Sequence, residues 1–98
     1  MTEIYKMYTG KLTPAWFALS EAEKKSMGEE LDHVREEAGG KIVVQCISHW
    51  ASEQNHSFGV EVFPSIEAVQ KHGKLLFELD WPKYYDGTTV LGIDVADA

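Results

Sequence analysis

The order in which two kinds of hydrophobic periodicity follow each other along this chain is the feature that most constrains its fold. Four short segments have alternating or β-branched side chains and predict strands, at 3–11, 41–50, 57–63 and 88–95. Apolar residues recur at helical spacing between the first and second strands, and again between the third and fourth. The sequence therefore predicts the element order β-α-β-β-α-β.

Both helices carry boundary signals. Ser20 and Glu23 fit a capping box, in which each side chain satisfies a free backbone N–H group of the other residue. Ser65 is expected to cap the second helix. The apolar stripe of the first helix consists of Met27, Leu31, Val34 and Ala38, and that of the second consists of Ile66, Val69, Gly73, Leu76 and Phe77.

This element order predicts a ferredoxin-like α+β fold. Right-handed crossovers place both helices on one face of a four-stranded antiparallel sheet, with the strand order 4-1-3-2. The 98 residues fit a single domain spanning 1–98.

Composition excludes several classes of partner. The net charge is −7 and Arg35 is the only arginine, so the basic footprint that nucleic acids or anionic membranes require is missing. No apolar run approaches the roughly 18 residues of a membrane span, and no signal pattern opens the chain. Cys46 is a lone cysteine and the histidines lack metal-ligand spacing. We expect a cytoplasmic protein with no metal and no required cofactor.

The sheet face away from the helices predicts a homodimer. We expect the helices to cover the apolar set of the third strand, which is Phe58, Val60 and Val62. The opposite face then carries a mixed set that includes Glu61 and, on the last strand, Asp94. Such a face is too apolar for water and too polar for an ordinary core. We expect it to pack against the sheet of a second copy, giving a dimeric α/β barrel.

Polar residues expected on that second face could carry chemistry. His49 or Glu61 could abstract a proton there, while Tyr8 or Lys6 stabilises an oxyanion. Alternatively, the same groups form an inter-subunit salt-bridge network that sets the register of the dimer. The full set is Lys6, Tyr8, Gln45, His49, Glu61 and Asp94.

Two further groups complete the candidate site. His72 borders the apolar face of the second helix and could point into a pocket beneath the helices. The candidate catalytic residues are His49, His72, Glu61 and Tyr85. Aromatic rings could line a pocket for a planar ligand, or simply fix the loop at 80–87 and cover the dimer edge. The candidate ligand-binding residues are Lys6, Tyr8, Trp16, Trp50, Trp81 and Tyr84.

Three patches of sequence resemble one family. Residues 13–20 are similar to a Pro-x-Trp-x-x-Leu segment, 56–65 to a strand ending in Phe-Pro, and 81–86 to a Trp-Tyr-x-Tyr loop. Together with the element order, they resemble the dimeric α/β-barrel superfamily, in an uncharacterised bacterial branch related to antibiotic-biosynthesis-monooxygenase-like proteins. The chain departs from that branch at Val62, where a tryptophan is common. Arg35, expected on the solvated side of its helix, does not fit the quinol-oxygenating pattern.

The resemblance implies several activities. Its members include cofactor-free monooxygenases, isomerases, polyketide cyclases, haem-degrading enzymes and non-catalytic proteins. The leading hypothesis is a homodimer that binds a small aromatic or polyketide-like molecule, with cofactor-independent oxygenase, isomerase or cyclase chemistry. The alternatives are a non-catalytic binding or assembly protein, and a haem-binding protein that uses His49 or His72.

Overall fold

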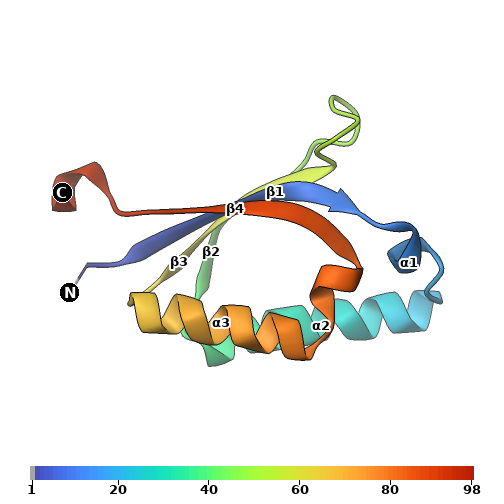
Figure 1. The fold of residues 1–98 in the computed structure, drawn as a ribbon, viewed down its shortest axis with the longest axis horizontal. Coiled ribbons are helices and arrows are strands. Elements are labelled where there is room, and N and C mark those ends of the chain that lie inside the picture. The colour runs from blue at the N-terminus through green and yellow to red at the C-terminus, as the bar shows by residue number, and fades with distance from the viewer. Residues whose placement is uncertain (1) are drawn as a thin grey trace.

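The structure, a computed structural model, describes residues 2–98 and is an α+β protein (Figure 1). Within this range no helix combines the length and apolarity needed to cross a membrane. In chain order, the elements are β1 (Ile4–Leu12), α1 (Pro14–Phe17), α2 (Glu21–Glu37), β2 (Lys41–Ile47), β3 (Ser57–Phe63), α3 (Ile66–Glu78), the 3-10 helix η1 (Trp81–Lys83), β4 (Tyr85–Gly92) and the 3-10 helix η2 (Val95–Asp97).

The four strands form one antiparallel sheet in the order β2-β3-β1-β4. This is the predicted order read from the other edge, and it is consistent with a ferredoxin-like arrangement. Helices α2 and α3 lie side by side against one face of the sheet, whereas no helix covers the other face within the described residues (Figure 1).

Local signals in the sequence explain the helix starts. The capping box at the start of α2 is formed, since Ser20 N donates to Glu23 Oε1 at 2.9 Å and Glu23 N donates to Ser20 Oγ at 3.1 Å. Ser65 Oγ accepts from the backbone of α3 as predicted. Thr13 makes no cap bond; its hydroxyl donates instead to Lys83 O at 2.7 Å and fixes the end of β1 against η1.

The last strand begins and ends earlier than predicted. Tyr85 already pairs with Leu12, and the strand stops at Gly92. Asp94, expected on the sheet, therefore lies beyond it and accepts a hydrogen bond from Ala96 N at the start of η2. The aromatic loop was expected to continue to 87. It ends earlier, because η1 turns the chain and β4 begins shortly after it.

The expected facing of the central strands is wrong. Lys6 and Glu61 are cross-strand neighbours on β1 and β3. Both side chains point toward the helices and not toward the open face. Phe58 and Val62 therefore face away from the helices, together with Val60 between them. Period-two alternation determines which residues share a face, but it does not determine which face the helices cover. Here the helices cover the polar one.

The apolar core occupies only one end of the layer between helices and sheet. Phe63 is completely buried there, against the end of α2 and the start of α3. Gly40 makes room for it, because a side chain at this position would collide with the Phe63 ring. Ala38 and Val69 complete this core, and Ile4 and Ala68 pack on it; Val34 is also buried.

Candidate functional site

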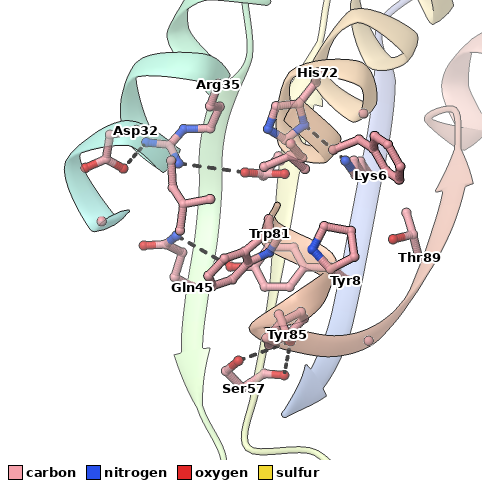
Figure 2. A pocket seen from close by; sticks show the side chains of 18 of the residues that line it. Lys6, Tyr8, Asp32, Arg35, Gln45, Ser57, His72, Trp81, Tyr85 and Thr89 are labelled. Carbon is pink, nitrogen blue, oxygen red and sulfur yellow. Dashed lines mark hydrogen bonds and ion pairs between the residues drawn. The ribbon is translucent and has the colours of Figure 1, made fainter. Parts of the chain in front are cut away.

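The rest of the layer between helices and sheet is a cavity of about 810 Å³. The strands contribute Lys6, Tyr8 and Gln45 to its wall, and the helices contribute Arg35 and His72 (Figure 2). Gln45 reaches this face because β2 has a bulge between Ile42 and Val44, which resets the alternation before Gln45 pairs with Gly59. Polar side chains thus occupy positions where an apolar core is usual.

Four buried polar side chains gather as two bonded pairs in a charged cluster at one end of the cavity. Lys6 Nζ donates to His72 Nδ1 at 3.0 Å. Arg35 lies 3.8 Å from the Glu61 carboxylate and bonds Asp32 at 2.6 Å (Figure 2). Relative exposures of Lys6, Arg35, Glu61 and His72 are 8, 8, 6 and 3%. Buried charges need partners, and these side chains supply them to each other.

Burial sets the protonation states of this cluster. Desolvation, assisted by the charges of Lys6 and Arg35, lowers the pKa of His72 from 6.5 to about 4. The His72 imidazole is therefore neutral near pH 7, and an Nδ1 that accepts from Lys6 leaves the proton on Nε2. Desolvation also lowers the pKa of Lys6 and raises that of Glu61, while their mutual attraction opposes both shifts.

Aromatic rings form the other end of the cavity. Trp81 stacks on Tyr85 with ring centroids 5.6 Å apart and an interplanar angle of 9°. The Tyr85 hydroxyl bonds Ser57, and the edge of Tyr8 meets the Tyr85 ring (Figure 2). Burial raises the pKa of both tyrosines, so each hydroxyl keeps its proton and can donate.

Glycine at position 59 lets Tyr8 reach this place. Gly59 is the cross-strand neighbour of Tyr8, and a side chain there would collide with the Tyr8 ring. The Tyr8 hydroxyl also accepts from Gln45 Nε2 at 3.4 Å. The tyrosine therefore lies across β3, between the charged cluster and the aromatic rings.

The arrangement offers donors, bases and a flat apolar surface in one space. Lys6 and Tyr8 can donate to an acceptor on a ligand, while Glu61 can accept a proton. The stacked ring of Trp81 can contact a planar ligand. Such a combination suits binding of an aromatic molecule with an acidic oxygen and transfer of a proton to or from it.

The cavity brings together six of the ten candidate site residues. These are Lys6, Tyr8, Glu61, His72, Trp81 and Tyr85. Trp16 and Tyr84 lie outside the lining; both rings pack edge-on, Trp16 against Trp81 and Tyr84 against Trp16. They support the aromatic end from behind.

His49 and Trp50 lie away from the cavity. Strand β2 ends at Ile47, and the following turn exposes both side chains, with Trp50 80% exposed. Trp50 Nε1 donates to Ile47 O at 2.9 Å, which holds the ring at the turn. The predicted strand was three residues too long, and the apolar character of Trp50 hid its end.

Arg35 is a further cavity residue whose position the sequence analysis misjudged, besides the strand residues that were expected on the other face of the sheet. It was expected on the solvated side of its helix, but it is buried and contacts Glu61. The available signal was its place beside the apolar stripe, four residues after Leu31 and next to Val34. An arginine there can bury its stem and carry its charge inward.

Metal and haem ligation depend on few residues here. Among residues 2–98, no three His, Cys, Asp or Glu side chains are grouped so as to hold a metal ion. His72 is the one histidine in the cavity lining. Its Nε2 is the atom that could bind an iron, since Nδ1 already accepts from Lys6.

Replacing His72 with glutamine is expected to remove part of the acid sensitivity of the fold. The unfolded chain protonates this histidine near pH 6.5 and the folded protein only near pH 4, so stability falls as the pH drops between these values. The wild type should lose up to about 1.4 kcal/mol per pH unit more than the variant in that window. Urea denaturation at several pH values measures this. The exposed His33 replaced by glutamine is the control, and equal slopes for wild type and His72→Gln would contradict the prediction.

Comparison with known proteins adds information on the fold alone. No protein-family profile and no curated protein matches the sequence. Among solved structures, one similar chain is the crystal structure of a protein of unknown function from Rhodopseudomonas palustris, a structural genomics target. It is 18% identical with a TM-score of 0.59, over 96% of this chain and 83% of the other. The chain thus shares its α+β fold with a protein whose function is itself unknown.

Proposed function

We propose that this protein binds a planar aromatic molecule with an acidic oxygen in the cavity between its helices and its sheet. One observation carries the proposal: four buried polar side chains and a stacked aromatic pair line a single cavity of about 810 Å³. Small-molecule sites typically measure roughly 300–1,000 Å³ and combine apolar walls with a few convergent polar groups.

The lining suggests how such a ligand is held. Its ring lies near Trp81, and its oxygen points toward Lys6 and the Tyr8 hydroxyl. A bound phenolate or enolate would give the buried Lys6 ammonium a second anionic partner besides Glu61. Binding of the ionised oxygen would therefore favour the charged form of Lys6, which burial alone disfavours.

The same geometry supports proton abstraction as the first chemical step. Glu61, whose pKa is raised by burial, takes a proton from an acidic C–H or O–H of the ligand. The electron pair left behind becomes an enolate or phenolate, which Lys6 stabilises. Cofactor-independent oxygenases, isomerases and cyclases share this step, and we place the protein in that group.

A calorimetric titration with 1-hydroxy-2-naphthoate, a two-ring acid, tests the binding proposal. We expect saturable binding to the wild type, and a dissociation constant at least about tenfold higher for Lys6→Met, which removes a charge-assisted hydrogen bond. Lys74→Met is the control, because Lys74 is exposed on α3 and lies outside the cavity lining. Absence of binding to the wild type, or an equal effect of both variants, would refute the proposed site.

A non-catalytic binding protein is the second candidate. It is favoured by the pairing of Glu61 with Arg35 and of Lys6 with His72, which ties the reactive groups to each other. Oxygen uptake with 1,4-dihydroxynaphthalene separates an oxygenase from a binding protein. An oxygenase accelerates the uptake and loses that effect in Glu61→Gln, whereas a binding protein leaves the uncatalysed rate unchanged.

We further propose that the open face of the sheet joins two copies in a homodimer. Four apolar side chains on this face are 41–56% exposed, namely Met7, Val44, Phe58 and Val90. Charged residues of this face, Lys11, Lys41 and Asp86, lie toward the strand ends. Monomers seldom expose contiguous apolar surface of this kind, and a second identical face would match it in chemistry and shape. The resemblance to dimeric α/β barrels supports the same partner.

Met7→Lys is expected to dissociate that dimer. Met7 lies on the central strand β1, so a lysine there would be buried without a partner between the two sheets. Sedimentation equilibrium at micromolar concentration should give a dimer for the wild type and a dissociation constant raised by about 100-fold or more for the variant. Gln70→Lys, on the exposed side of α3, is the control. A monomeric wild type would exclude the dimer.

A further inference from the structure

Two glycines stand opposite the sheet in the middle of the two helices. Gly28 lies in α2 and Gly73 in α3, and both line the cavity. Gly73 falls on the apolar stripe of its helix, four residues after the buried Val69. A larger apolar residue would be the usual choice at such a position.

Packing does not explain these glycines. In the described chain, no atom of another element lies within 4 Å of where a Cβ would stand at Gly28 or Gly73. Gly40 and Gly59 differ, because a side chain there would collide with Phe63 or Tyr8. Glycine within a helix costs stability relative to alanine. The two positions thus keep space open at the expense of helix stability.

The space adjoins a buried donor. His72 precedes Gly73, lines the same cavity and is 3% exposed. Its Nδ1 accepts from Lys6, and no hydrogen bond joins its Nε2 to the side chains of residues 2–98. A ligand atom in the cavity could therefore accept from Nε2 while the body of the ligand extends along the helices.

The helix geometry gives the length of that body. Gly28 precedes Arg35 by seven residues, so the two lie about 10 Å apart along the axis of α2. Leu31, Leu76 and the 75% exposed Phe77 also line the cavity and give it apolar surface, while Lys25 and Glu29 flank Gly28 in the same lining. Each further fused ring lets a ligand held at the charged cluster reach further along this distance.

We infer that the ligand is an acid of three or more fused rings, whose acidic end meets Lys6 and whose far rings lie against the backbone at Gly28 and Gly73. The inference rests on the proposed binding function and specifies its ligand class. A side chain at either glycine would compete with the far rings for the same space. The acidic end would be unaffected by a change at Gly28.

Two probes of different length test the inference by calorimetry. Anthraquinone-2-carboxylate has three rings, and 1-hydroxy-2-naphthoate has two. Gly28→Leu should raise the dissociation constant of the three-ring probe by about tenfold or more, and that of the two-ring probe by less than about twofold. Ala22→Leu, at an exposed position of α2 outside the lining, should change neither. If the wild type binds neither probe, the proposed function is refuted. If the wild type binds both probes and Gly28→Leu leaves both dissociation constants unchanged, this inference alone is refuted.

Melting temperatures without ligand provide the second measurement. Gly28→Ala and Gly73→Ala should each raise the melting temperature by roughly 2–8 °C, because alanine favours the helix and meets no neighbour. A lower melting temperature in either variant would mean that the fold itself needs the glycine, and would overturn the inference. Circular dichroism of Gly28→Leu confirms that the affinity loss is measured on folded protein.

Discussion

Replacing Glu61 with leucine is expected to lower the free energy of unfolding by about 3–5 kcal/mol. Glu61 is the buried carboxylate that faces both Lys6 and Arg35. Without it, Lys6 can release its proton, but the Arg35 guanidinium cannot. The cost therefore arises mainly from a buried arginine whose remaining partner, Asp32, is largely exposed.

Urea denaturation at pH 7 measures this loss. Glu53→Leu, in the exposed loop between β2 and β3, should change stability by no more than about 0.5 kcal/mol. The double variant Arg35→Met/Glu61→Leu should recover part of the loss, because it removes both members of the buried pair. If Glu61→Leu were as stable as the wild type, the carboxylate would not balance the buried cations.

Replacing Phe63 with alanine is expected to cost about 3–5 kcal/mol. Phe63 is the side chain with no exposed surface, and it joins the sheet to both helices at the apolar end. The His72 ring lies 5.0 Å from its centroid, so the cavity left behind would also loosen the support of the charged cluster. The small size of the apolar core makes this one residue important for the whole layer.

Thermal and urea unfolding of Phe63→Ala measure the effect. Phe77→Ala is the matched control, since Phe77 is 75% exposed and should cost less than about 1 kcal/mol. Comparable losses in the two variants would show that burial at position 63 does not dominate stability.

Periodicity and caps were sufficient to predict the architecture. The element order, the strand order and the capping box at Ser20 all follow from local spacing and were confirmed. These features depend on residues near each other in sequence, or on the handedness of chain connections.

The content of the space between helices and sheet could not be predicted in the same way. The rule that helices cover the more apolar face fails at Phe58 and Val60, because a polar cavity replaces the usual core there. The position of Arg35 was mispredicted for the same reason. An inward-pointing guanidinium is favourable only if the Glu61 carboxylate also points inward. The position of Arg35 along its helix does not indicate that Glu61 is its partner.

The unequal surroundings of the three tryptophans have a practical consequence for spectroscopy. Trp16 and Trp81 meet edge to face at 5.9 Å beside the cavity, whereas Trp50 is held in a remote exposed turn. The tryptophan emission of a Trp50→Phe protein would therefore come only from the aromatic end. Its fluorescence and near-ultraviolet circular dichroism would respond to events at that end without an added label.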